Sequence, residues 1–433
     1  MRASTRPRPS DLSKVITRWR GLGAVLAVAF YSLFFAAHLK FFDSPVYVRD
    51  GLIFGARSHT VFNDLTTPRS SDHSGISPLH PAFTLLHQPL AQLFTQGWLM
   101  LGQDLSSARK HGVAMLTCLA GALAVVMVFH TLLWAGSATM RAALMAMVFG
   151  ASTCAWIVAP LPETWTFAGL GMVALIAVTA RGPLAHPAWH LLASVYAIST
   201  FFGSIIPCLI VALTRCAQDR AETGHFKVKP LLVTLAAVTI SFGLANVQRQ
   251  IYPSSKPLPK TWQEWCSLNS GWQASRETQA LVAREVFISN IVAPPYVTTQ
   301  LEITRPKVVL SKPIWSMLDL RRGLSAGWLL ILVLAFAGLV WRAQLEPFTL
   351  GVVSTFMWSI ATLSWYGQQE TLLLHACLWT GLVVIAAGLG LERALAHWSR
   401  LTTPITLFLA IFVSTLIMRN WMFIQDVADM PGR

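Results

Sequence analysis

Long runs of apolar residues recur along almost the whole chain. A helix needs about 20 apolar residues to cross roughly 30 Å of hydrocarbon, and each run is long enough to do so. We therefore predict an all-α bundle of membrane-spanning helices rather than a soluble fold. The clear runs cover residues 21–41, 111–134, 141–159, 164–180, 230–247, 323–341, 347–365, 374–392 and 402–418.

The apolar stretch 185–214 decides the number of crossings. Basic residues precede the first run and also fill segment 215–229, so both regions are expected on the cytoplasmic side. Both can lie there only if 185–214 crosses twice, as two short helices interrupted around Gly203 and Pro207. We predict about eleven spans in total. A single tilted span would give ten and invert everything downstream.

The polar segments between the runs divide the chain further. Segment 77–102 is apolar but interrupted by prolines, histidines and glutamines, which favours interfacial helices over a further span. The predicted parts are a cytoplasmic basic tail (1–20), an N-terminal transmembrane module (21–247) with a first outer loop (42–110), an extracytoplasmic loop (248–322) and a C-terminal transmembrane module (323–433).

Composition supports a membrane protein. Of the 433 residues, 54% are hydrophobic and only 12% are charged, which is about half the charged share of a soluble domain. The net charge of +14 would suggest nucleic acid in a soluble protein, but most basic residues here stand in short loops beside apolar runs. We expect no nucleic-acid partner. We place the chain in the plasma (inner) membrane, crossing many times, with a cytoplasmic N-terminus.

The first apolar run and the cysteines add two expectations. The run resembles a signal peptide, but its length and the poor cleavage site at Ala36-Ala37-His38 favour a retained anchor. The six cysteines form no CxxC pair, and four of them lie in apolar runs. They therefore indicate neither a disulfide framework nor a metal site.

Acidic residues in hydrocarbon are costly, and most of those here fall outside the apolar runs. The first outer loop carries Asp43, Asp50 and Asp64 together with Arg57 and Arg69. Such a loop can supply a general base for a hydroxyl and cations for a phosphate leaving group. A solvated loop without any catalytic role would have the same composition.

Two further carboxylates and a histidine stand at predicted helix starts on the outer side. Glu163 and Glu370 each lie in a short outer corner beside aromatic residues. Each can cap a helix N-terminus or contact substrate. His80 precedes Pro81 at the beginning of an apolar helix, where it can bind phosphate or simply begin the helix.

Three pieces of the sequence resemble a known family. They are DLTTPRSSDHSGISPLHPAFTLLHQPL at 64–90, APLPETWTFAGLGMVAL at 159–175 and WYGQQETLLLHACLW at 365–379. In layout and in these pieces the chain resembles the polytopic GT-C-fold glycosyltransferases that take a sugar from a polyprenyl-phosphate carrier. The pieces match that family's first outer loop with its His-Pro helix start, a Pro-Glu before a membrane helix, and a Gln-Glu outer corner.

The resemblance implies an inverting transferase acting on the extracytoplasmic face. A first-loop aspartate would be the base (Asp43, Asp64 or Asp50). The donor phosphate would be held by Arg57, Arg69 or His80, and Glu163 and Glu370 would orient donor or acceptor. The expected partners are a polyprenyl-phosphate-linked sugar, a lipid or glycan acceptor and membrane lipids. The sequence departs from the family at Phe54-Gly55-Ala56-Arg57, where an acid is expected in place of Arg57.

Other functions stay open at this stage. Arg57 is compatible with a non-catalytic relative that binds a lipid-linked glycan without turning it over. The predicted helix break near Gly203 and the cationic outer surface are compatible with a transporter or flippase of lipid-linked or small polar cargo. Scattered aspartates do not define a metal site, so no cofactor is assigned and a divalent cation stays open.

Overall fold

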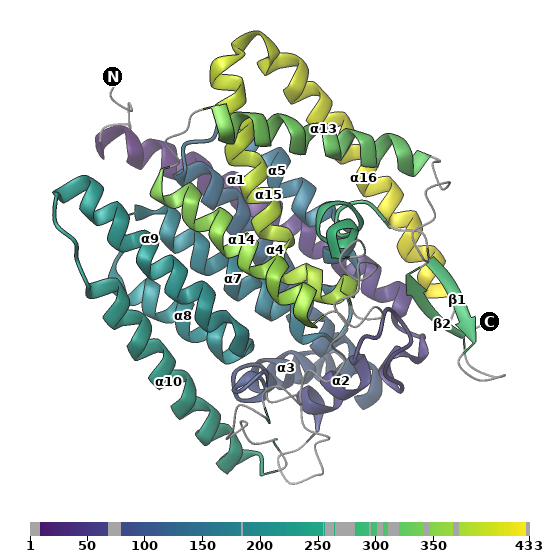
Figure 1. Cartoon of the computed structure of the whole chain (residues 1–433). Coiled ribbons are helices and arrows are strands. Elements are labelled where there is room, and N and C mark those ends of the chain that lie inside the picture. The colour runs from purple at the N-terminus through teal and green to yellow at the C-terminus, as the bar shows by residue number, and fades with distance from the viewer. Residues whose placement is uncertain are drawn as a thin grey trace.

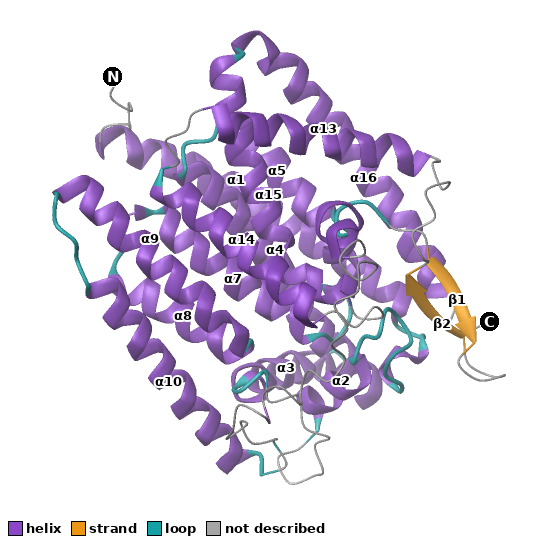
Figure 2. Cartoon of the chain, in the orientation of Figure 1, coloured by secondary structure: helices purple, strands orange, loops and turns teal. Residues whose placement is uncertain are grey.

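The protein is described here from a computed structural model, which defines residues 9–67, 79–182, 185–253, 255, 264, 282–293, 296–300, 306–310, 320–341, 346–366 and 372–429. These residues form a helical bundle with one short strand pair (Figures 1 and 2). Most long helices run from the upper left to the lower right of Figure 1, and the two ends of the chain lie at opposite ends of the bundle.

Every apolar run predicted to span the membrane is helical. Seven of the described helices are long and apolar enough to cross a membrane (α1, α4, α9, α10, α13, α15 and α16), and α5, α7 and α14 are shorter apolar helices. The bounds are α1 (Pro9–Phe41), α4 (Leu105–Trp134), α5 (Thr139–Ala151), α6 (Thr153–Val158), α7 (Thr164–Ala180), α8 (Pro187–Thr200), α9 (Ile205–Thr223), α10 (Lys229–Ile251), α13 (Leu320–Trp341), α14 (Pro347–Tyr366), α15 (Leu372–His397) and α16 (Thr402–Asp429).

The stretch 185–214 forms two helices, as the eleven-span prediction requires. The chain leaves α8 at Phe201, which has extended backbone angles, makes a single 3₁₀ turn (Phe202–Ser204) and enters α9 at Ile205. The backbone groups freed at this break are used elsewhere. Phe202 donates its N–H to the carbonyl of Leu79, and Ser199 accepts from the N–H of Ala82.

The segment before α4 contains α2 (Ser58–Thr66) and α3 (Phe83–Met100), neither of which is among the candidate spans. At 30 residues α4 is about 45 Å long, well beyond the hydrocarbon thickness. Helix α3 packs against the first half of α4, with Thr95 beside Gly112, and leaves Leu90 and Leu93 exposed. This arrangement agrees with interfacial helices at one end of the bundle.

The predicted span 141–159 is not one helix. Ser152 has extended backbone angles, and its side chain caps α6 by accepting from the N–H of Ala155. The next two amides, of Thr153 and Cys154, donate to the carbonyls of Ile291 and Asn290. The prediction of a continuous span was wrong. In a continuous helix these amides would donate to carbonyls one turn earlier, whereas here the carbonyls of a distant backbone segment accept from them.

That segment belongs to the long loop predicted to lie outside the membrane. Residues 282–293, including a π-helical turn (Glu285–Ser289), pack into the bundle, and Glu285 and Asn290 are fully buried. Asn420 of α16 holds the segment, accepting from the N–H of Ala293 and donating to the carbonyl of Ile291. Farther along, β1 (Tyr296–Gln300) pairs antiparallel with β2 (Pro306–Leu310), which the sequence did not indicate.

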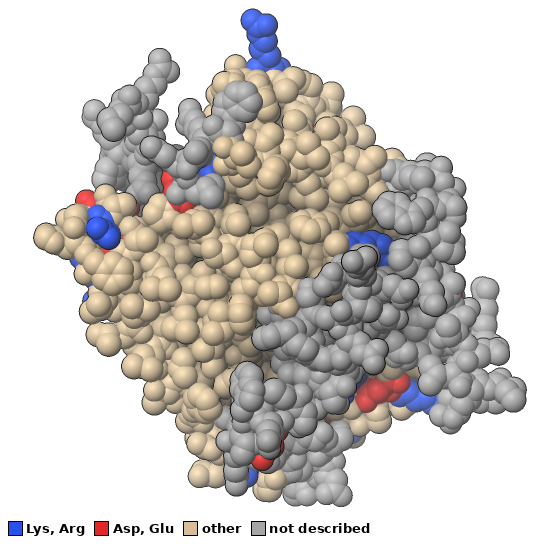
Figure 3. Space-filling view, viewed as in Figure 1, with Lys and Arg blue, Asp and Glu red and all other residues tan. Residues whose placement is uncertain are grey.

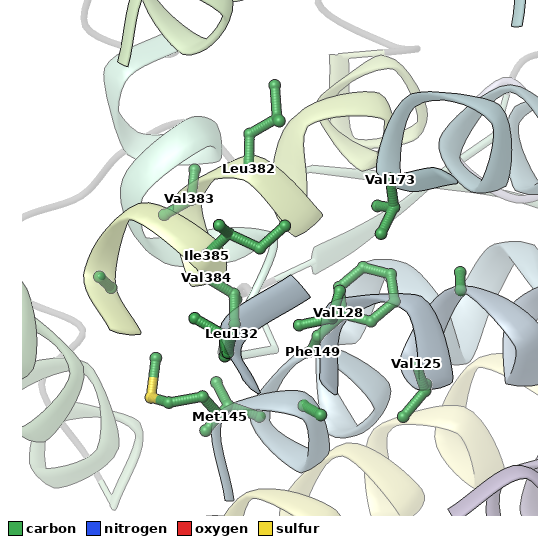
Figure 4. Close-up of a cluster of buried hydrophobic side chains, with 14 of the residues drawn as sticks. Val125, Val128, Leu132, Met145, Phe149, Val173, Leu382, Val383, Val384 and Ile385 are labelled. Carbon is green, nitrogen blue, oxygen red and sulfur yellow. The ribbon is translucent and has the colours of Figure 1, made fainter. Parts of the chain in front are cut away.

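The core lies where α4, α5, α7 and α15 meet. Branched aliphatic side chains of these helices interlock in the middle of the bundle (Figure 4). The peripheral helices α10, α13 and α16 instead expose residues such as Leu235, Phe336 and Ile411. The middle of the face in Figure 3 is a broad surface with few charged atoms. Exposed apolar side chains on the outer helices are what lipid contact requires.

One cysteine corrects the sequence interpretation. Cys154 in α6 is disulfide-bonded, although the spacing of the cysteines indicated no disulfide framework. Cys118, Cys208 and Cys216 are free and buried, and the first two lie in apolar runs, where a thiol packs as a small hydrophobic group. A disulfide depends on proximity in the folded chain, which spacing along the sequence does not report.

Candidate functional site

Three of the predicted site residues, Asp50, Arg57 and Glu163, meet at the start of α2. Arg57 occupies the N-cap position of α2 but makes no side-chain cap, so the first amides of the helix need partners from elsewhere. Two of the predicted carboxylates supply them. Asp50 accepts from the N–H and from the hydroxyl of Thr60, and Glu163 is bonded by the backbone N–H of Arg57.

Glu163 caps a helix other than the one it precedes. It stands at the N-cap position of α7, yet its side chain makes no bond to that helix. Its carboxyl instead receives the N–H of Arg57 and, over 3.5 Å, the hydroxyl of Ser58. Capping was one of the two roles predicted for Glu163, and the structure realises it between two helices far apart in sequence.

The loop before α2 adopts an unusual backbone to present Arg57. Phe54 has φ = 49°, the only positive φ of a non-glycine residue in the described part of the chain, and its ring is buried against Phe423. Gly55, with φ = 73°, continues the turn. Strained backbone of this kind is retained when packing holds it in place, and it concentrates at functional sites.

The electrostatics of Glu163 reflect its position under this loop. The pKa of the Glu163 carboxyl is raised to about 8, chiefly by burial and in smaller part by the charge of Asp50. The Arg57 amide and guanidinium and the Ser58 hydroxyl act in the opposite direction. At neutral pH the group is therefore mostly protonated but close to its titration point, which suits proton transfer.

His80 is tied into the protein through both ring nitrogens. Its Nδ1 contacts the carbonyl oxygen of Thr200, which can only accept, so Nδ1 carries the proton. Its Nε2 lies 3.1 Å from the hydroxyl of Thr164 and accepts from it. The pKa of His80 is lowered to about 4, chiefly by burial and in smaller part by the Arg57 charge, while the bond to Thr200 acts in the opposite direction. His80 is thus neutral and joins α7 to the end of α8, a geometry that favours positioning over phosphate binding.

An aromatic cluster adjoins these residues. Trp165 contacts His80, Phe201 and His375 edge to face, with ring centroids 5.3, 5.5 and 4.5 Å apart. The cluster unites the starts of α7 and α15 with the α8–α9 break. His375, near the start of α15, is one of its members.

Arg57 is the cation common to this group. Its guanidinium is exposed, yet it is close enough to Glu163, His80 and His375 to influence the charge state of each. No other predicted cation occupies such a position among the described residues. The arrangement can hold an anion at Arg57 beside a carboxyl group near neutrality.

The three predicted bases differ in their surroundings. Asp43, just past the end of α1, is exposed, and Asp64 on α2 is buried with 1% of its surface accessible. Asp50 is exposed and lies close enough to Glu163 to raise its pKa. The structure therefore brings Asp50, rather than Asp43 or Asp64, into the group. Arg69 and Glu370 lie outside the described residues.

Known proteins give a limited comparison. No family model matches the chain, and no curated protein matches it. It is similar to the crystal structure of ArnT from Cupriavidus metallidurans in the apo state, with 14% identity and a TM-score of 0.47 over 89% of this chain and 62% of that one. It is also similar to the Archaeoglobus fulgidus oligosaccharyltransferase in the apo form, with 10% identity and a TM-score of 0.48 over 94% and 56%. The chain spans less than two thirds of either structure.

Sequence reasoning missed the hydroxyl groups that complete the site. Ser58, Thr60 and Thr164 orient Glu163, Asp50 and His80 respectively. The only signal was their place at the starts of two helices, where such residues are common. Within the described ranges, no three histidine, cysteine or acidic side chains are grouped to hold a metal ion.

Proposed function

We propose that the chain is a membrane glycosyltransferase that moves a sugar from a polyprenyl-phosphate carrier to a lipid or glycan acceptor, with inversion at the anomeric carbon. One observation carries the proposal. Arg57 and Asp50 are both exposed, and both lie close enough to buried Glu163 to influence its charge, at one end of a bundle whose sides are apolar. A carrier phosphate embedded in the bilayer can reach a cation at that position.

We place this end on the extracytoplasmic face of the plasma membrane, with the N-terminus in the cytoplasm. The start of α1, with its basic residues, and the basic α9–α10 connection both lie away from the site end. Cys154, disulfide-bonded, is in α6, which leads into the site through Glu163. Disulfides persist in oxidising compartments and are rare in the cytosol, which supports this orientation.

The proposed reaction is a single displacement. The acceptor oxygen forms a bond to the anomeric carbon while the bond from that carbon to the carrier phosphate oxygen breaks. The electron pair leaves with the phosphate, whose charge Arg57 stabilises, and the acceptor proton passes to a carboxylate. Asp50 is the base we favour, with Asp43 and Asp64 as the other sequence candidates. Glu163 orients the site, and Arg69 and Glu370 stay predicted donor contacts.

The test is transfer of radiolabel from polyprenyl-phosphate sugars to membrane lipids and glycans. We expect each of Arg57→Ala and Asp50→Asn to lose about a hundredfold or more in rate. Asp50→Asn removes the general base, and Arg57→Ala removes the cation that stabilises the leaving phosphate. Arg49→Ala is the matched control, since Arg49 is also exposed in the same loop. Thr60→Val removes one bond to Asp50 but keeps the carboxylate, so it separates base chemistry from helix capping.

Two outcomes would contradict the proposal. If the wild-type chain binds the carrier lipid but transfers no label, the chain is a binding relative in which Arg57 has replaced a catalytic acid. If label is transferred and only Asp43→Asn or Asp64→Asn stops it in a folded protein, the transferase stands but Asp50 is not its base.

A further inference from the structure

A cavity of about 260 Å³ lies at the opposite end of the bundle from the candidate site. It is far larger than the roughly 10–15 Å³ that accommodates one water molecule. Four helices, α7 to α10, contribute to its wall. The residues that line it are Val178, Ala185, Pro187, His190, Arg215, Asp219, Lys227, Lys229, Pro230 and Val233.

The lining carries an excess of positive charge. Arg215, Lys227 and Lys229 face a single lining carboxylate, Asp219. Glu222 is also near enough to Arg215 to interact with it electrostatically. The Arg215 Nη1 atom is buried and has no hydrogen-bond partner among the residues that the structure describes. A buried donor without a partner is costly, so an acceptor in the cavity would stabilise it.

His190 adds a second unused polar atom. The side chain is 6% exposed, and its Nε2 lies 3.2 Å from the hydroxyl of Thr234. Its Nδ1 is buried, has no partner within the described part of the chain, and belongs to a residue that lines the cavity. Two helices also begin at the cavity wall, α8 at Pro187 and α10 at Lys229. Helix N-termini favour anions, and here they add to three cationic side chains.

The surroundings indicate that the anion is attached to a lipid. Apolar side chains next to the lining residues are exposed, with Phe226 and Val228 alternating with the two lysines and Trp189 preceding His190. Aromatic residues at helix ends typify the headgroup level of a bilayer. Basic pockets between transmembrane helices on the cytoplasmic side bind anionic headgroups.

We propose that the α7–α10 cavity binds the phosphate of an anionic membrane phospholipid on the face opposite the candidate site. The two lysines at the mouth attract the headgroup, and Arg215 and His190 donate to the phosphate inside. The acyl chains lie along the exposed leucines of α9 and α10, such as Leu213 and Leu232. This site is independent of the proposed transferase activity.

The test is native mass spectrometry of the delipidated full chain, titrated with phosphatidylglycerol, phosphatidylcholine or inorganic phosphate. We expect the Lys227→Gln/Lys229→Gln double variant to bind phosphatidylglycerol about tenfold more weakly or worse, since each cation near an anionic headgroup contributes appreciably. Arg220→Gln is the matched control. Arg220 is an exposed cation in the last turn of α9, close in sequence to both lysines, but it does not line the cavity. Both lysines are exposed, so folding should be unaffected, which thermal unfolding checks.

Three results would overturn the proposal. Equal losses in Arg220→Gln and the double variant would indicate general surface attraction. Unchanged phosphatidylglycerol binding in the double variant would place the lipid elsewhere. If inorganic phosphate fills the site and phosphatidylglycerol binds no better than phosphatidylcholine, the cavity holds a soluble anion and the lipid assignment fails.

Discussion

The hydroxyl of Ser58 donates to the carboxyl of Glu163 over 3.5 Å, so the residue before α7 caps α2, which begins 105 positions earlier. This single contact joins the first outer loop to the transmembrane bundle. Because the same carboxyl also receives the Arg57 amide, the position of Arg57 depends on Glu163. The Glu163 carboxyl therefore both joins two parts of the fold and positions a residue of the candidate site.

Glu163 should make stability depend on pH. Its pKa is about 8 in the folded chain against 4.5 ordinarily, so between these values the folded state holds a proton that the unfolded state has released. The free energy of unfolding must then fall as pH rises from about 4.5 to 8. We expect thermal unfolding in detergent to show this decline and Glu163→Gln to reduce it. An identical slope in the variant would assign the decline to other groups.

Asn420 should be essential for seating residues 282–293. Its fully buried side chain bonds the N–H of Ala293 and the carbonyls of Ile291 and Ala151. Asn420→Leu would leave these groups unpaired, at a cost of about 2 kcal/mol or more. Thr415→Val, on the exposed side of the same helix, should change stability by less than about 0.5 kcal/mol. Equal melting temperatures for the two variants would argue against the anchor.

Helices α13 and α15 should tolerate no side chain at their crossing. A Cβ on Gly338 would overlap the carbonyl oxygen of Gly390, and one on Gly390 would overlap that of Ala335. Small residues allow such close approach in membrane bundles. We expect Gly338→Val to lower the melting temperature and the monodisperse fraction on size exclusion. Gly243→Ala meets open space and should be neutral or stabilising. A well-folded Gly338→Val protein would contradict this packing.

The topology can be tested with two single cysteines. Gln103 and Thr223 are exposed at opposite ends of the bundle, separated by α4, the α5–α6 pair, α7, α8 and α9. In intact cells an impermeant maleimide should label Gln103→Cys, whereas Thr223→Cys should require lysis. A ten-span chain would put both positions on one side. Labelling of both in intact cells would therefore reject the eleven-span arrangement.

The sequence alone anticipated the helices, but the candidate site only in part. Apolar runs predict membrane helices well because hydrocarbon leaves the backbone no other partner than itself. The same physics located the break near Gly203, since the basic segments on either side needed a common face. The acidic and basic residues of the site were found as a group in sequence, because charged residues avoid hydrocarbon and collect at its edges.

Only the tertiary structure decided how these residues are used. The sequence offered Asp50 as one of three possible bases and Glu163 and His80 as substrate contacts or helix starts. Contacts with Thr60, Ser58 and Thr200 decide how the structure holds each of them. The break at Ser152, the buried segment 282–293 and the bonded Cys154 were likewise invisible in sequence. Each depends on partners more than a hundred residues away or on spacing in three dimensions. Local apolar pattern determines which segments enter the membrane, whereas polar groups inside take whichever distant partner the packing brings within hydrogen-bond reach.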